Sequence, residues 1–308
     1  MEPDESQEIA VPDAYLDTVE IHGRLFQKHA LQHKIYFAPV DEEEAQRLQL
    51  FHHVFHILFD KRLIFPGPIP SPRRILDCGF GSATWAIEVA DSHPRCEVIG
   101  VDIASQMSPP DLPPNLYLEV DDLNQRLNFD PSYFDIVHSR CVAGGIDADR
   151  WGDYTKELNR VLIPGGWCQM VEVYFNAQSN NGTLTDGHGL RRWSQLYLQS
   201  IQPEKNGRVG LRLEELMRSA GFENVEARMM QLPLCAWPED AREKEVGAAN
   251  RENMSHLLSS LAIYPFTERL GMSINEVQVL LAQARRDAQD PSLKAYFPVY
   301  VCIGQKKR

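Results

Sequence analysis

Two glycines placed directly after an apolar, strand-sized run constrain the fold of this chain more than any other feature. Residues 74–78 predict a buried strand, Gly79 and Gly81 allow the backbone to turn tightly, and residues 83–91 have the spacing of a helix. Residues 97–102 predict a second strand, which completes a strand-helix-strand unit. In such a unit the loop backbone can approach a ligand, and the helix N-terminus points toward it. We therefore predict a ligand site at the carboxyl edge of a parallel sheet.

The alternation of strands and helices continues along the chain. Further strands are predicted at residues 116–120, 134–138, 167–174, 225–231 and 295–303, and helices at 151–162 and 211–220. This order predicts the α/β class, with a doubly wound parallel sheet that carries helices on both faces.

An N-terminal part, residues 1–72, precedes the main domain of residues 73–308. Residues 1–34 lack periodicity and predict a loosely attached arm. Asp41, with Glu44 three residues later, predicts the start of a helix that reaches about residue 63 and packs on the sheet. The prolines after that helix, at residues 65–72, predict a stiff linker.

A long insertion is predicted within the main domain, at about residues 233–291. It has the spacing of two or three helices, one of which begins at Ser273 with Glu276 in a capping box. An excursion of this size beside the carboxyl edge of a sheet is typical of a lid.

The residues of the glycine turn favour S-adenosyl-L-methionine as the ligand. Dinucleotide sites have glycine or alanine three residues after the second glycine, and this chain has Thr84 there, which disfavours NAD. Asp77, two residues before the first glycine, suits the positive sulfonium and amino groups of S-adenosylmethionine. Asp102 ends the next strand, where a carboxylate can accept hydrogen bonds from both ribose hydroxyls.

The third strand ends at the same edge with two more carboxylates, one of which can bond the adenine amino group. Groups that converge on this edge form the expected crevice of a doubly wound sheet. The predicted cofactor-binding residues are Asp77, Gly79, Gly81, Asp102, Ile103, Asp121, Asp122 and Leu123.

Charge and composition narrow the possible partners and compartments. A net charge of -12 repels a phosphate backbone, which argues against nucleic acid. The apolar runs are strand-sized, so no membrane span is expected, and the N-terminus lacks a secretory signal, so a cytoplasmic location is predicted. The basic tip at residues 306–308 is either a solvated terminus or a weak nuclear address. Six scattered cysteines predict reduced, mostly buried thiols.

Several runs of this sequence resemble the fungal methyltransferase family that includes the LaeA-like regulators of secondary metabolism. The runs are residues 39–44, 75–86, 98–102, 134–145, 164–167 and 295–300, and the similarity covers nearly everything after Tyr36. The resemblance implies a Rossmann-like, seven-stranded sheet with an antiparallel last strand, a bound S-adenosylmethionine, and a substrate under the inserted helices. One residue departs from the superfamily, because Ala83 stands where a third glycine is usual. This alanine is expected to weaken cofactor binding.

Methyl transfer from a sulfonium chiefly requires alignment and exclusion of water. For a hydroxyl acceptor, His138 at the end of the fourth strand is the predicted general base, and His188 and His256 are weaker candidates. A metal at His52 and His56 is not predicted, because no carboxylate lies between them in the sequence.

Four aromatic residues in the later insertions can line a substrate pocket or belong to the core: Trp193, Tyr197, Trp237 and Tyr264. Three functions stay open at this point. The first is methylation of a small-molecule secondary metabolite. The second is a LaeA-like nuclear regulator that acts in a protein complex, and the third is a methyltransferase fold that has lost methyl transfer. The oligomeric state is not predicted.

Overall fold

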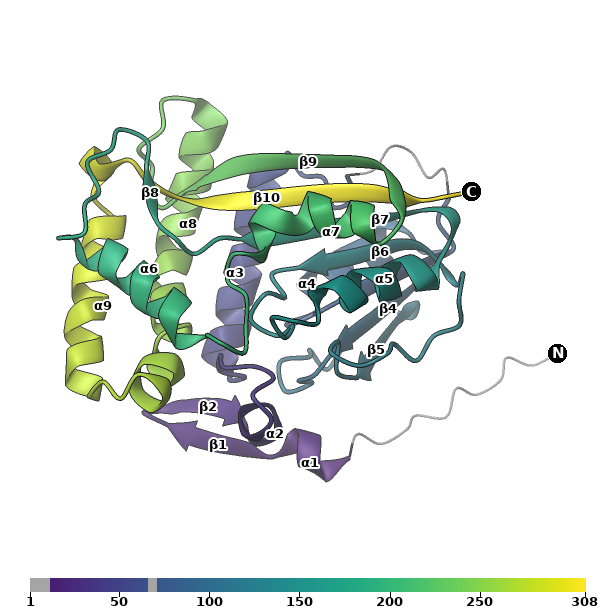
Figure 1. Cartoon of the computed structure of the whole chain (residues 1–308), viewed down its shortest axis with the longest axis horizontal. Coiled ribbons are helices and arrows are strands. Elements are labelled where there is room, and N and C mark those ends of the chain that lie inside the picture. Colours follow the sequence, from purple (N-terminus) through teal and green to yellow (C-terminus); the bar gives the residue numbers. More distant parts are fainter. Residues whose placement is uncertain (1–11, 66–70) are drawn as a thin grey trace.

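The structure is a computed structural model that describes residues 12–65 and 71–308. Its centre is a mixed sheet (Figure 1). The strands are β3 (Arg74–Cys78), β4 (Glu97–Asp102), β5 (Leu116–Val120), β6 (Phe134–Arg140), β7 (Leu162–Val173), β8 (Gln178–Ser179), β9 (Phe222–Pro233) and β10 (Ala295–Lys306). They are ordered β5-β4-β3-β6-β7-β10, and β10 also pairs with β9 and β8. The strands β3 to β7 are parallel and β10 is antiparallel to its neighbours, so the predicted sheet is confirmed, with the two-residue β8 added.

Helices cover both faces of the sheet, as predicted. Successive side chains of a strand point to opposite faces. On β3, Ile75 packs with α4 (Thr84–Ser92), whereas Leu76 packs on the other face with α5 (Trp151–Val161) and α7 (Leu213–Ser219). A short η1 turn (Val209–Arg212) leads into α7. The two apolar layers hold the strand ends in place at the carboxyl edge.

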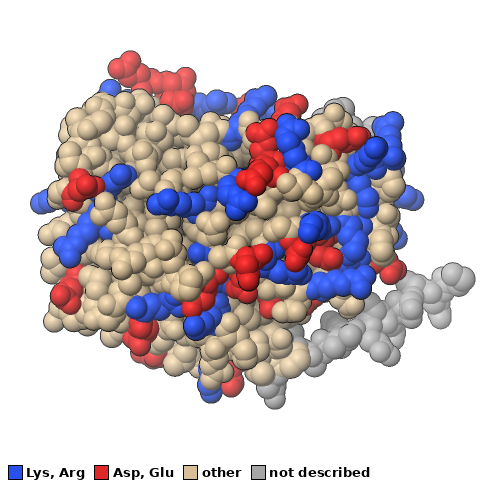
Figure 2. Space-filling model, in the orientation of Figure 1, with Lys and Arg blue, Asp and Glu red and all other residues tan. Residues whose placement is uncertain are grey.

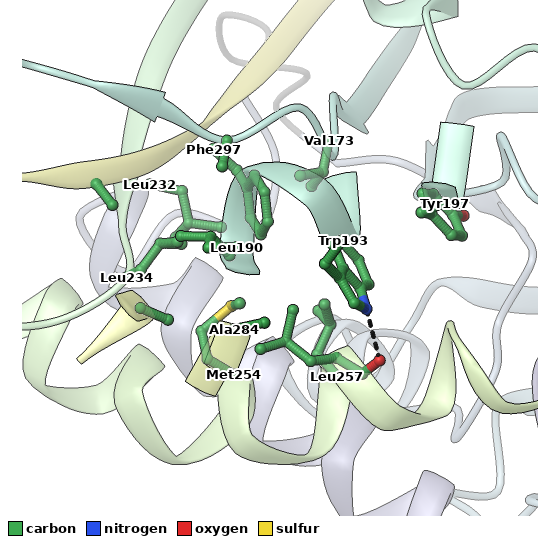
Figure 3. Packing of buried hydrophobic residues seen from close by; sticks show 14 of the residues in the cluster. Val173, Leu190, Trp193, Tyr197, Leu232, Leu234, Met254, Leu257, Ala284 and Phe297 are labelled. Carbon is green, nitrogen blue, oxygen red and sulfur yellow. Dashed lines mark hydrogen bonds between the residues drawn. The ribbon is translucent and has the colours of Figure 1, made fainter. Parts of the chain in front are cut away.

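A helical subdomain lies at one end of the sheet (Figure 1). It contains α6 (Gly189–Ser200), α8 (Ala241–Ser260), η2 (Pro265–Arg269), α9 (Ile274–Ala288) and η3 (Pro291–Leu293). The capping box predicted at Ser273 is present, with Glu276 in the reciprocal position. These helices share one hydrophobic core with α3 (Glu42–Leu58), and Trp193 stands at its centre (Figure 3). Helices α8 and α9 lie within the insertion predicted at residues 233–291, α6 lies before it, and their apolar residues are packed together.

The N-terminal part is more firmly attached than predicted. It forms α1 (Asp13–Leu16), a hairpin of β1 (Thr18–Ile21) and β2 (Arg24–Gln27), and α2 (Lys28–Gln32). Phe26 is buried, and the Gln27 side chain donates a hydrogen bond to the Ile103 carbonyl at 2.8 Å. The prediction of a loose arm is thus wrong for residues 24–30. Residues 1–11, and residues 66–70 of the predicted linker, lie outside the described part of the chain.

Asp41 joins this N-terminal part to the rest of the molecule. Its carboxylate caps α3 by accepting the Glu44 N–H at 3.0 Å, as predicted from the sequence. The same carboxylate pairs with the Arg24 guanidinium at 2.7 Å and accepts the Leu25 N–H, which the sequence did not indicate. The hairpin and the start of α3 therefore form one unit.

Candidate functional site

The turn after β3 has the conformation that its glycines predict. Gly79 and Gly81 both have positive φ, and a Cβ atom at Gly79 would lie 2.5 Å from Cγ1 of Val142. Ala83 also has a left-handed backbone, with φ of 57°. A side chain at position 79 would therefore be strained by its φ and would also collide with the neighbouring loop.

We expect Gly79→Ala to reduce the free energy of unfolding by about 1 to 3 kcal/mol. Urea unfolding measures this loss. The loss should be smaller when Val142→Ala is already present, because the shorter side chain removes the collision but not the strained φ. An equal loss in both backgrounds would show that Val142 does not restrict this position.

A cavity at the carboxyl edge brings most of the predicted cofactor-binding residues together. Its lining includes Gly79, Gly81, Asp102, Ile103, Asp122 and Leu123. The Asp102 carboxylate accepts hydrogen bonds from the Gly81 N–H at 2.9 Å and the Ala104 N–H at 3.1 Å, so it fixes the glycine turn to the end of β4. The donor set and the space that the glycines leave fit an adenosyl ligand.

Two of the predicted residues lie beside the cavity and do not line it. The Asp121 carboxylate accepts a hydrogen bond from the Asp122 N–H at 2.8 Å. Of the two aspartates that follow β5, only Asp122 lines the cavity. Asp77 is buried beneath the glycine turn. Burial raises the pKa of the Asp77 carboxyl to about 7, against the opposing effect of Arg140, and Asp102 raises it further.

This raised pKa predicts a pH-dependent stability in the absence of cofactor. The folded chain holds the Asp77 proton more tightly than the unfolded chain does, so the folded state loses stability as pH rises from about 4 to about 7. Asp77→Asn removes the charge, and its free energy of unfolding relative to the wild type should rise across this range by about 2 to 4 kcal/mol. Urea unfolding at pH 5 and pH 8 measures the difference. Asp91→Asn, at an exposed position, is the control, and parallel curves for Asp77→Asn and wild type would contradict the prediction.

Ala83, which departs from the usual third glycine, does not line the cavity. It is fully buried at the start of α4, and only its neighbours Ser82 and Thr84 are among the lining residues. Its left-handed backbone keeps the turn that a glycine would make. The structure therefore gives no steric reason for the weaker cofactor binding expected from this alanine.

The opposite wall of the cavity was not predicted as part of the site. It is formed by the segment before α3, by apolar residues of α3 and by one histidine of that helix: Ile35, Tyr36, Leu48, Phe51, Phe55 and His52. Arg140 and Cys141, at the end of β6, also line the cavity. Burial raises the pKa of the Cys141 thiol to about 12, and its backbone has a positive φ of 58°. The sequence could have indicated Arg140 as a residue of the site, because it ends a parallel strand at the same edge of the sheet as Gly79.

The histidine predicted as general base lies elsewhere. His138 is buried in β6, its ring stacks on Trp85 at 3.9 Å, and its Nδ1 accepts a hydrogen bond from the Gln169 amide at 2.7 Å. Burial lowers its pKa well below the usual range. His138 is absent from the lining of the cavity, and so are His188 and His256. The position of His138 gives the predicted catalytic role no support.

His52 and His56 meet a carboxylate that the sequence did not reveal. Glu88 comes from α4, and its oxygens lie 2.6 Å from Nε2 of His52 and 3.2 Å from Nδ1 of His56. Donor atoms of the three side chains all lie within 4.8 Å of one another. No carboxylate lies between the two histidines in the sequence, as stated above, but the fold supplies one from another helix, so that reason does not exclude a metal. Arg140 lies against His52, however, and its positive charge opposes a cation there.

The predicted aromatic substrate pocket is not found. Trp193 is fully buried in the core of the helical subdomain, where its Nε1 donates to the Leu258 carbonyl at 2.9 Å (Figure 3). Tyr197 stacks on Trp193 at 5.4 Å, and Tyr264 stacks on Phe37 at 5.8 Å. Trp237 donates to the Ala295 carbonyl at 2.8 Å. None of the four lines the cavity. Trp193, Tyr197 and Tyr264 belong to or pack against the core, a role that the sequence could not separate from a pocket because helical spacing marks both kinds of position.

The comparisons with known proteins agree with this geometry. Residues 75–166 match the model of a methyltransferase domain. Methyltransferase pytC of Aspergillus terreus is 30% identical over 288 residues, which cover 92% of this chain and 87% of that protein. The secondary metabolism regulator laeA of Aspergillus fumigatus is 28% identical over 299 residues, 96% of this chain and 78% of that protein.

The fold also matches a solved structure. Phosphoethanolamine N-methyltransferase 2 of Haemonchus contortus, in complex with phosphomonomethylethanolamine and S-adenosylhomocysteine, aligns with a TM-score of 0.51 and 20% identity. The alignment covers 84% of this chain and 53% of that chain. The sheet, the glycine turn and the matched domain define an S-adenosyl-L-methionine-dependent methyltransferase. The chain belongs to the LaeA-like family of fungal methyltransferases of secondary metabolism.

Proposed function

We propose that the methyl acceptor of this enzyme is a small-molecule secondary metabolite. The observation that supports the proposal is the apolar wall of the cavity, where Leu48, Phe51 and Phe55 of α3 face the strand ends. A wall of this kind encloses a ligand of limited size and excludes water from it. The 30% identity to methyltransferase pytC, a relative named as an enzyme and not as a regulator, extends over most of both chains and also supports the proposal.

The groups that line the cavity favour catalysis by alignment. S-adenosylmethionine, when bound, supplies a methyl group that the sulfonium already activates. Burial and Arg140 lower the pKa of His52 to about 4, and burial raises that of Cys141 to about 12, so neither is tuned as a base near neutral pH. The chain's own contribution is to hold the cofactor at Asp102 and Asp122, to orient the acceptor under α3 and to exclude water.

The test is a transfer assay with labelled S-adenosylmethionine and an extract of a fungus in which the gene has been deleted. The deletion lets the unmethylated acceptor accumulate. Label should appear in the fraction of small molecules, and Asp102→Ala should strongly reduce the signal when labelled S-adenosylmethionine is kept below saturation. Label found only on protein would contradict the proposal.

Protein methylation is the second candidate function. The relative in Emericella nidulans is named protein-methionine methyltransferase laeA, and it is 27% identical over 292 residues. The same assay distinguishes the two, because a protein acceptor would carry the label after separation by size. A stable protein partner in a pull-down, with a tagged copy in the nucleus, would also favour this candidate.

We also propose a cytoplasmic location and no nucleic-acid partner. Figure 2 shows acidic and basic side chains interspersed over one face, without a continuous basic surface. The net charge of -12 also argues against a nucleic-acid partner, because it repels a phosphate backbone. In the described part of the chain, no helix is both long and apolar enough to cross a bilayer. Fluorescence of a tagged copy tests the location.

A further inference from the structure

Arg140 is a half-buried cation that lines the cavity, and among the described residues no carboxylate lies within ion-pair distance of it. It ends β6 directly after Ser139, which pairs with Cys78 of β3, so it lies beside Gly79 on the neighbouring strand. Its guanidinium lies 5.1 Å from the centre of the Phe55 ring and donates from Nη2 to Nδ1 of His52 at 3.3 Å. Burial lowers its pKa. The carboxylates of Asp77 and Glu88 oppose that effect from a distance, but neither forms the direct ion pair that a charge withdrawn from water ordinarily has.

The hydrogen bonds around Arg140 hold it without neutralising it. Guanidinium groups only donate, so Nδ1 of His52 accepts and the ring proton lies on Nε2. Nε2 then donates to Glu88 at 2.6 Å. The histidine stays neutral, because burial and Arg140 lower its pKa to about 4. Glu88 therefore orients His52, His52 orients Arg140, and the positive charge remains available to the cavity.

The order of the strands locates this charge relative to the cofactor-binding residues. Along the edge the order is β5, β4, β3 and β6, which places Asp122, Asp102, Gly79 and Arg140 in one row. The two carboxylates suit the adenine and the ribose, so the methionine part of the cofactor belongs at the end of the row formed by β3 and β6. Ser82 and Thr84, at the N-terminus of α4, also line this end, and a helix N-terminus favours an anion.

We propose that Arg140 binds the carboxylate of the methionine part of S-adenosylmethionine, positioned by the His52–Glu88 pair. The proposal deepens the cofactor assignment and rests on the cofactor-binding row described above. It does not depend on which acceptor is methylated. A carboxylate of the acceptor would have the same chemistry, and the choice of ligands in the test separates the two sources.

The test uses isothermal titration with two ligands and no acceptor. The first ligand is S-adenosylhomocysteine, and the second is its decarboxylated analogue, which keeps the adenosine, the thioether and the amine. Wild-type protein should bind the first about 10- to 100-fold more tightly than the second. Arg140→Gln should reduce that preference to within about threefold, mainly through weaker binding of S-adenosylhomocysteine.

Two further variants keep the result interpretable. Arg140→Lys retains the charge on a side chain with a different shape, and its preference should be intermediate. Arg62→Gln removes an exposed guanidinium that lines a small neighbouring cavity, and it should keep the full preference. An equal loss for both ligands in Arg140→Gln would show a structural role and overturn the proposal. If Arg140→Gln still preferred S-adenosylhomocysteine as strongly as the wild type does, the proposal would also be overturned. The cofactor carboxylate would then be bound by other groups, and Arg140 could bind a carboxylate of the acceptor.

Discussion

Replacing Asp102 by alanine should weaken the binding of S-adenosylhomocysteine by about 10- to 100-fold, or about 1.5 to 3 kcal/mol. Two losses contribute to this effect. The predicted hydrogen bonds to the ribose hydroxyls disappear, and the N–H groups of Gly81 and Ala104 lose the carboxylate that now accepts from them. The glycine turn is then no longer fixed to the end of β4. Isothermal titration with S-adenosylhomocysteine measures the affinity.

A matched pair of variants shows whether the carboxylate itself matters. Asp102→Asn keeps one side-chain oxygen for one of the two backbone donors, so its loss should be smaller than that of the alanine variant. Asp111→Ala, at an exposed position in the following loop, should bind as the wild type does. Unchanged affinity in Asp102→Ala would show that the carboxylate acts only within the fold and that the ribose is held by other groups.

Replacing Trp193 by alanine should reduce the free energy of unfolding by about 3 to 5 kcal/mol. The indole is fully buried among α6, α8 and β10, lies 6.3 Å from the Phe297 ring, and donates to the Leu258 carbonyl. Removing it leaves a large cavity and an unpaired carbonyl in the core that α3 shares (Figure 3). Urea unfolding at constant pH measures the loss.

Trp193→Phe separates a core role from a substrate-binding role. The smaller ring keeps part of the packing and loses the hydrogen bond, so the variant should be less destabilised than Trp193→Ala, and its affinity for S-adenosylhomocysteine should not change. Tyr117→Ala, at a position 45% exposed, should change stability by less than about 0.5 kcal/mol. A Trp193→Phe variant of wild-type stability would contradict the packing described here.

The parts of the molecule that the sequence predicted well depend on short stretches of chain. The glycine turn, the start of α3 at Asp41 and the capping box at Ser273 are each set by residues only a few positions apart. The strand-end residues Asp102 and Asp122 were found because parallel strands bring their carboxyl ends to one edge. Signals of this kind are visible before any tertiary contact is known.

The remaining features depend on contacts between distant segments. Arg140, His52 and Glu88 come from three elements, and no spacing in the sequence relates them. The apolar spacing of α3 correctly predicted a packed helix but could not show that Phe51 and Phe55 also form the wall of a cavity. For Trp193 the same kind of spacing fitted either a residue that lines a substrate pocket or a residue of the hydrophobic core. Its full burial in the structure shows that it belongs to the core.

The shared core of α3 has a consequence for synthesis on the ribosome. Phe51 and Phe55 contribute to the cluster that contains Leu257 and Phe297, and both of these residues follow almost the whole sheet in the chain. A nascent polypeptide therefore exposes part of the apolar face of α3 until the last third of the chain has been translated. Chaperones have a long interval in which to bind that helix, and a chain that ends before β10 lacks Phe297 and so an essential part of the core on which α3 packs.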